Sequence, residues 1–111
     1  MPRQPRVAFP GARYHVIGRG NRRQQVFFEA EDYLTFLGMA VDALRTFEVQ
    51  LFCYSLMPNH FHVHLCTPHG NISRFMHSLL TSYAGTITRK RNLPGHLFQN
   101  RFWARIAEPG L

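Results

Sequence analysis

The most regular pattern in the chain is a strict alternation of polar and apolar residues near its middle. Three histidines alternate there with three apolar side chains, in the order His60, Phe61, His62, Val63, His64 and Leu65. A period of two predicts a half-buried β-strand whose apolar residues face a core while the histidines share the opposite face. Pro58 and Asn59, directly before this segment, predict a tight turn. We therefore expect three imidazole rings side by side, just past a turn.

Two longer segments show apolar residues at helical spacing instead. The first predicts a helix over residues 31–47 that serves core packing, with a stripe of Leu34, Leu37, Val41 and Leu44 widened by Tyr33, Phe36, Ala40 and Ala43. The second predicts a helix that begins at an N-cap of Asn71 or Ser73 and ends by Asn92. Its apolar stripe consists of Ile72, Phe75, Met76, Leu79, Leu80, Tyr83 and Ile87.

Three further segments complete the predicted fold. Residues 13–17 and 48–55 predict strands, and residues 96–106 suit an edge strand or hairpin packed on the sheet. The resulting order is the βαββαβ plan of ferredoxin-like and RRM-like domains. We expect an α+β fold, a single antiparallel sheet with two helices on one face and the histidines on the other. Residues 1–12 predict a flexible basic lead-in, and residues 13–111 form one domain.

The charge balance favours a polyanionic partner. The chain has 111 residues, with 13 Lys and Arg against 6 Asp and Glu, a formal net charge of +7 and a pI near 10.5. Nucleic acid is the first candidate for such a basic protein. Binding to a membrane surface would call for one strongly amphipathic basic helix, whereas the basic residues here are spread over several elements.

Cysteine usage and the lack of long apolar runs indicate a cytoplasmic protein. Cys53 and Cys66 lie in adjacent predicted strands and do not form a disulfide framework, so we expect buried thiols. The N-terminus has no apolar run of signal-peptide length, and no stretch approaches the length of a membrane span.

Three basic segments are candidates for contacts with nucleic acid. The loop over residues 18–25 contains Arg19, Asn21, Arg22 and Arg23 among glycines that allow close approach to backbone N–H groups, although a solvated turn has the same composition. Arg89, Lys90 and Arg91 end the second helix, where they suit either a phosphate clamp or the helix dipole. Near the C-terminus we assign Arg101 to nucleic acid and Phe98 and Phe102 to packing, and we leave Trp103 open.

The histidine spacing allows a metal half-site. Neighbours on one face of a strand lie about 6.6 Å apart, so His60 and His62 can converge on one ion, whereas His60 and His64 lie about 13 Å apart. One strand therefore supplies two ligands, and other elements must complete the site. The alternative is a polar strand face with histidines in water or bonded to neighbours.

Four segments resemble, in family order, the single-tyrosine HUH transposases (His, bulky apolar residue, His), in particular the branch associated with bacterial repetitive extragenic palindromes (REP). They are Tyr14 to Asn21, Phe47 to Val49, Leu56 to His62, and Gly95 to Arg101. The resemblance covers roughly residues 13–105.

The resemblance implies a specific chemistry. In this family two HUH histidines and a third polar side chain hold Mg²⁺ or Mn²⁺ at a scissile phosphate in single-stranded DNA beside a hairpin. A tyrosine hydroxyl attacks and leaves a 5′-phosphotyrosine link and a free 3′-OH. Carried over by position, His60 and His62 would be the metal ligands, while His64 lies outside the motif.

The family's nucleophile is the main departure. It lies on a later helix, in a motif of the Tyr-Ile-x-x-Asn-Pro type, and the 111 residues contain no such motif. Tyr83 resembles a different family tyrosine and lies on an apolar stripe, which favours core packing over catalysis. We therefore expect either a shortened copy or a site completed by a second chain, for example in a homodimer.

Three functions agree with these patterns. The first is a transposase-like protein that binds hairpin single-stranded DNA and cleaves it with a metal ion. The second is a DNA-binding remnant without chemistry. The third is a Zn²⁺-dependent hydrolase, which would need three protein ligands.

Overall fold

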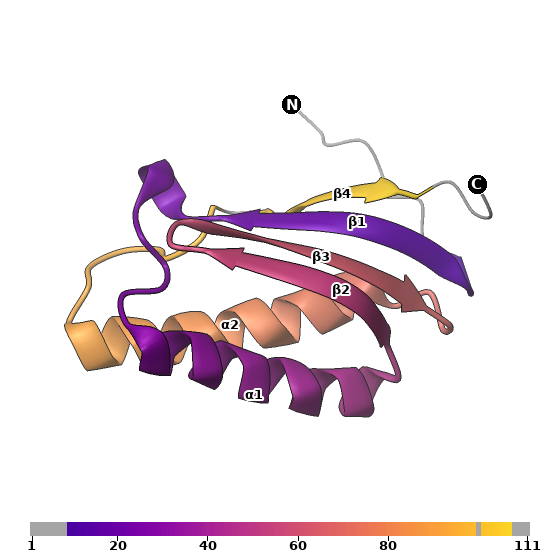
Figure 1. Ribbon diagram of the computed structural model, residues 1–111, viewed down its shortest axis with the longest axis horizontal. Helices are drawn as coiled ribbons and strands as arrows, with labels where there is room; N and C mark the ends of the chain where they lie inside the picture. Colours follow the sequence, from indigo (N-terminus) through magenta and orange to yellow (C-terminus); the bar gives the residue numbers. More distant parts are fainter. Residues whose placement is uncertain (1–8, 100, 108–111) are drawn as a thin grey trace.

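The computed structural model describes residues 9–99 and 101–107. Its elements are, in order, β1 (Ala12–Arg19), the 3₁₀ turn η1 (Asn21–Arg23), α1 (Ala30–Phe47), β2 (Gln50–Met57), β3 (His60–Thr67), α2 (Ile72–Arg91) and β4 (Trp103–Ile106). The strands form one antiparallel sheet in the order β2-β3-β1-β4. Figure 1 shows both helices on the same side of this sheet. The α+β architecture expected from the sequence is confirmed.

The element boundaries differ from the expected ones by a few residues. Residues 1–8 of the lead-in predicted for residues 1–12 lie outside the described residues. Ala12, the last residue of the predicted lead-in, belongs to β1. A two-residue turn, Pro58 and Asn59, joins β2 to β3. The stretch expected to begin a strand at residue 96 is mostly irregular, and β4 begins only at Trp103.

The hydrophobic core lies between the sheet and the two helices. The apolar residues of the alternating segment, Phe61, Val63 and Leu65, are buried in it. The stripe predicted for α2 is confirmed, because all its members are buried except Leu80, which is partly buried. Gly18 on β1 pairs with Phe61, and a Cβ at Gly18 would collide with the Phe61 ring. The alternation along β3 therefore sorts its side chains as expected.

The face of α1 that enters the core differs from the prediction. Leu34 and Val41 are 69% and 44% exposed, whereas Phe36, Ala40 and Ala43 are buried. Two overlapping apolar stripes run along this helix. Packing selects the stripe with two alanines, because small side chains let α1 approach its neighbours closely. A local pattern could not distinguish the two stripes.

A buried carboxylate ties the start of α1 to the end of α2. Asp32 is fully buried and accepts hydrogen bonds from the N–H groups of Phe28 (2.8 Å) and Glu29 (3.2 Å). Lys90 Nζ and Arg91 Nη2 lie 3.0 and 3.2 Å from its oxygens. Burial alone would raise the pKa of Asp32, but the hydrogen bonds from Lys90 and the two N–H groups, with the charge of Arg91, hold that pKa below its ordinary value.

The two cysteines have different surroundings. Cys66 is buried as expected, but Cys53 is exposed on the edge strand β2, so that half of the prediction is wrong. The two thiols are free. In the described part of the chain no helix is long and apolar enough to cross a membrane.

Candidate metal and nucleic-acid site

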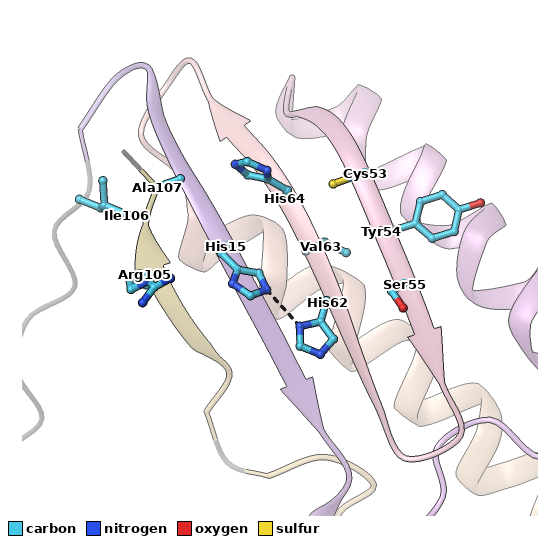
Figure 2. Close-up of a pocket in the computed structure, with 10 residues that line it drawn as sticks. All are labelled: His15, Cys53, Tyr54, Ser55, His62, Val63, His64, Arg105, Ile106 and Ala107. Carbon is cyan, nitrogen blue, oxygen red and sulfur yellow. Dashed lines mark hydrogen bonds between the residues drawn. The ribbon is translucent and has the colours of Figure 1, made fainter. Parts of the chain in front are cut away.

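The open face of the sheet carries a row of histidines from two neighbouring strands. In the antiparallel register of β1 and β3, His15 pairs with His64, Ile17 with His62 and Arg19 with His60. Figure 2 shows His15, His62 and His64 on the same side of the sheet, with the helices behind it. His15 thus joins the three histidines that the sequence pattern places together.

Three of these rings form a continuous contact chain. The ring centroids of His60 and His62 are 5.2 Å apart, and those of His62 and His15 are also 5.2 Å apart. His15 Nε2 and His62 Nδ1 lie 3.0 Å apart and share a hydrogen bond, drawn as a dashed line in Figure 2. His60 Nδ1 lies 2.8 Å from Asn59 Oδ1. The Nδ1 atoms of both His60 and His62 therefore take part in hydrogen bonds.

These hydrogen bonds suit metal binding at the other ring nitrogen. Asn59 Oδ1 can only accept, so His60 donates from Nδ1, and the neutral ring then has its lone pair on Nε2. Histidines that bind metals usually donate their second ring N–H in this way. The donor set of two imidazoles thus fits a divalent ion. Among the described residues no cluster of three or more His, Cys, Asp or Glu side chains is suited to a metal ion.

A polar hollow of about 530 Å³ surrounds the two histidines. Its lining consists of Arg19, Gly20, Arg23, Asn59, His60, His62 and Gln99. Gln99 comes from the segment before β4, and its backbone N–H donates to the carbonyl of Arg19 at 2.9 Å. The hollow is therefore lined by two imidazoles, two guanidinium groups and two side-chain amides.

Backbone hydrogen bonds hold the walls of this hollow together. Gly20 N–H donates to the carbonyl of Asn59 (2.9 Å), and Asn21 N–H donates to the carbonyl of Leu97 (2.8 Å). A Cβ at Gly20 would collide with the carbonyl oxygen of Gln24. Three segments far apart in the sequence are thus fixed around one site.

Burial and neighbouring charge lower the pKa of two of the histidines and so favour their neutral form. Burial lowers the pKa of His60, and the charges of His62 and Arg19 lower it further. Burial also lowers the pKa of His15, followed by the charges of His62, Arg105 and His64. A neutral imidazole keeps the lone pair that a metal ion needs.

His64 has different surroundings from His60 and His62. It lines a second hollow of about 720 Å³, shared with His15, His62, Cys53 and Arg105 (Figure 2). Its Nε2 is buried and has no hydrogen-bond partner among the described residues. His64 does not line the hollow around His60, which agrees with the separation expected from strand geometry.

The candidate DNA-binding residues gather at one end of the molecule but differ in their surroundings. Arg19 and Arg23 line the hollow, and Asn21 and Arg22 belong to the same η1 turn. Arg89 is exposed at the end of α2, and Arg101 lines a separate groove beside that helix. This end is at the left in Figure 1, where η1, the β2–β3 turn and the end of α2 meet.

Lys90 and Arg91 are engaged with the protein itself. Besides Asp32, Lys90 pairs with Glu29 and Glu31 at 3.4 and 3.6 Å, and Arg91 pairs with Glu29 at 2.9 Å. Much of their charge is therefore balanced by α1. Their contact with DNA stays a prediction, and a weaker one than that of Arg19 and Arg23.

Tyr83 lies in the core, on the helix side of the sheet. It is fully buried, and its hydroxyl donates to the carbonyl of Val26 at 2.6 Å. Burial, reinforced by the charge of Asp32, raises the pKa of this hydroxyl well above its ordinary value. Phe98 is buried and Phe102 partly buried, as expected, whereas Trp103 is 44% exposed on the open face.

Sequence reasoning missed two residues of this site. His15 occupies an outward position of β1, but its contact with His62 depends on the register of β1 against β3. Gln99 lies within one of the segments that carry the family resemblance, yet only its pairing with Arg19 brings it to the hollow. Alternation along β1 places His15 on a face but does not tell which residue lies opposite.

The fold and the family comparison agree. The model of the IS200-like transposase family matches residues 8–108, so the chain belongs to this family. Among curated proteins no match is found.

Two solved structures share the fold. One is a REP-associated tyrosine transposase bound to a REP hairpin, with a TM-score of 0.80 and 18% identity; the match covers 99% of this chain and 64% of that chain. The other is a candidate transposase from Deinococcus radiodurans R1, with a TM-score of 0.71 and 19% identity; the match covers 97% of this chain and 88% of that one. The chain thus spans 64% of the length of the REP-associated transposase.

Proposed function

We propose that this protein binds hairpin single-stranded DNA at the basic end of the sheet and holds Mg²⁺ or Mn²⁺ between His60 and His62. The observation that carries the proposal is the hollow itself, where the imidazoles of His60 and His62 lie beside two guanidinium groups. Arginine binds phosphate through a planar fork of donors. Family membership and the similar structure with a bound REP hairpin support the choice of DNA as the ligand.

We propose Gln99 as the third metal ligand. It lines the same hollow as His60 and His62, and its backbone is fixed to Arg19. An amide carbonyl is a hard oxygen ligand of the kind that Mg²⁺ and Mn²⁺ accept beside imidazole. A ligand from this segment would complete the site without a further helix. A zinc hydrolase is less favoured, because the described residues offer no third His, Cys, Asp or Glu at this site.

The chemistry divides between the metal ion and the chain. When bound, the divalent ion would offset negative charge on the phosphoryl oxygens. Arg19 and Arg23 would bind and orient the phosphate, while Asn59 keeps Nε2 of His60 available. No tyrosine of the described residues lines the hollow, and Tyr83 is buried on the other side of the sheet. All four tyrosines of the 111 residues lie in the described part of the chain. We therefore assign the attacking hydroxyl to a tyrosine that these 111 residues do not supply, for example one on a partner chain.

Incubation with a labelled DNA hairpin that carries a single-stranded flank tests this function. We expect a retarded complex on a native gel, and no complex at low salt would contradict the proposal. With Mn²⁺ and a denaturing gel, the 111-residue chain should give no covalent adduct, since its tyrosines do not reach the hollow. A slow band that survives denaturation would overturn our placement of the nucleophile. Binding that persists unchanged in the absence of His60 and His62 would favour a DNA-binding protein without chemistry.

Salt dependence tests the two arginines of the hollow. Replacing Arg19 or Arg23 by glutamine should reduce the slope of log K against log salt concentration by about 0.7 to 0.9 for each phosphate that the variant no longer neutralises. Arg45 is exposed near the other end of α1, so Arg45→Gln provides the matched control. Equal slopes for all three variants and the original protein would remove Arg19 and Arg23 from the interface.

Paired substitutions test Gln99 as a ligand. Gln99→Ala should weaken Mn²⁺ binding by at least about 10-fold, the lower end of what a ligand's hydrogen-bond partner contributes. Gln99→Glu should strengthen it, because a carboxylate is a better ligand than an amide. Gln25→Glu adds the same charge at the same end of the sheet but outside the hollow. If Gln25→Glu strengthens binding as much as Gln99→Glu, the effect is general electrostatics, and Gln99 is not a ligand.

A further inference from the structure

We propose that His15 is a positioning residue that holds His62 in the tautomer able to bind a metal ion. This inference rests on the proposed metal site at His60 and His62. It assigns a role to the first strand of the sheet, which supplies no metal ligand of its own. The motif around His62 cannot show it, because His15 lies 47 residues away in sequence.

The two rings meet along the direction of their hydrogen bond. The planes of His15 and His62 are inclined by only 20°, and their centroids are 5.2 Å apart. That separation is about what a 3.0 Å bond and the radii of two five-membered rings require. The rings therefore lie nearly in one plane, edge to edge, and the hydrogen bond is well aligned.

The single proton in this bond decides which atom of His62 is available. If His62 donates from Nδ1 to Nε2 of His15, the lone pair of neutral His62 is on its own Nε2, as in His60. If His15 donates instead, Nε2 of His62 carries the proton and cannot bind a metal ion. Histidines that bind metals usually have a partner that accepts from the second ring nitrogen. His15 would therefore do for His62 what Asn59 does for His60.

Neighbouring residues hold His15 in place for this contact. The backbone of β1 pairs with β3 on one side and with β4 on the other, and His15 is opposite Arg105 in that second pairing. The rings of Trp103 and His15 pack in a T-shaped arrangement, with centroids 5.8 Å apart and planes at 86°. The strand positions fix the ring near His62, and Trp103 restricts its rotation.

Nuclear magnetic resonance of ¹⁵N-labelled, metal-free protein tests the tautomer directly. At about pH 8, above the ordinary pKa of histidine, the ¹⁵N shifts of each ring identify the protonated nitrogen. We expect His62 to be protonated at Nδ1 in the original protein and to lose that preference in His15→Phe. A His62 ring protonated at Nε2 in the original protein would overturn the proposal.

Metal affinity tests the consequence. His15→Phe keeps an aromatic ring but no acceptor, and we expect it to weaken Mn²⁺ binding by about 10- to 100-fold. His15→Gln offers an amide oxygen as acceptor and should lose less. Equal losses in the two variants, with the tautomer of His62 unchanged, would show that ring packing and not the hydrogen bond matters, and would overturn the proposal.

The matched control is His64→Phe, which makes the same change on the same face but outside the His60–His62 hollow. It should leave Mn²⁺ affinity unchanged, and a loss equal to that of His15→Phe would contradict a specific role for His15. Failure of the proposed metal site can be told apart from failure of the proposed role of His15. In that case His62→Ala would bind Mn²⁺ as well as the original protein, while the ¹⁵N shifts would still report whether His15 sets the tautomer.

Discussion

Replacing His60 or His62 by alanine is expected to reduce Mn²⁺ affinity by more than about 100-fold, beyond the effect typical of a ligand's hydrogen-bond partner. Among the described residues, His60 and His62 are the two imidazoles that line the hollow, so in our proposal no neighbouring imidazole replaces either one. Isothermal titration calorimetry with MnCl₂ measures the loss. Because both side chains are only half-buried and alternate with the core residues of β3, we expect the unfolding temperature of the metal-free protein to change little.

Two other histidines provide controls for this prediction. His64 lies on the same face of β3 but outside the hollow, and His77 is exposed on α2. Neither His64→Ala nor His77→Ala should change Mn²⁺ affinity. If His60→Ala and His62→Ala bind Mn²⁺ as tightly as these controls do, the assignment of the metal site is wrong.

Replacing Asp32 by asparagine is expected to cost about 3 kcal/mol of unfolding free energy, the lower part of the range for breaking a buried ion pair. The carboxylate is fully buried, and two cationic side chains and two N–H groups converge on it. Asparagine keeps the volume but loses the charge, and its NH₂ group would face donors. Urea denaturation at pH 7 measures the change. Asp42→Asn, at an exposed position of the same helix, should change stability little.

The pH dependence of the same pair of proteins tests the cause. The pKa of Asp32 is lower in the folded protein than its ordinary value near 4. Its stabilising contribution is therefore complete above that ordinary value and is lost as the pH falls through the lower folded pKa. The stability difference between the original protein and Asp32→Asn should be constant from pH 7 to about pH 5 and shrink below about pH 4. A difference that stays constant down to pH 3 would contradict an ionic origin.

The ion cluster around Asp32 also bears on the DNA interface. Lys90 and Arg91 follow Arg89 in sequence, and the three look equivalent as a phosphate clamp. In the folded chain only Arg89 extends to solvent without an acidic partner among the described residues. The positive charge that could serve the proposed DNA interface at this end therefore comes mainly from Arg19, Arg22, Arg23, Arg89 and Arg101. A run of basic residues does not reveal which members are balanced by a distant helix.

The sequence alone was sufficient for the features that depend on local periodicity. Alternation along residues 60–65 placed the histidines on the open face and Phe61, Val63 and Leu65 in the core, because side chains of a strand alternate between two faces. The order of elements led to the α+β fold, and the family segments led to His60 and His62 as metal ligands, an assignment that stays a prediction. The apolar stripe of α2 was likewise correct, since only one stripe runs along that helix.

Tertiary structure decided the features that depend on which segments meet. Two apolar stripes of α1 could face the core, and packing selected one of them. This choice fixed the rotation of α1 about its axis and left Leu34 facing solvent. The register of β1 against β3 brought His15 to His62, and a backbone bond to Arg19 brought Gln99 to the hollow. Each of these contacts joins residues tens of positions apart. Local patterns report which face a side chain occupies, whereas its partners across the sheet follow only from pairing and packing of the whole chain.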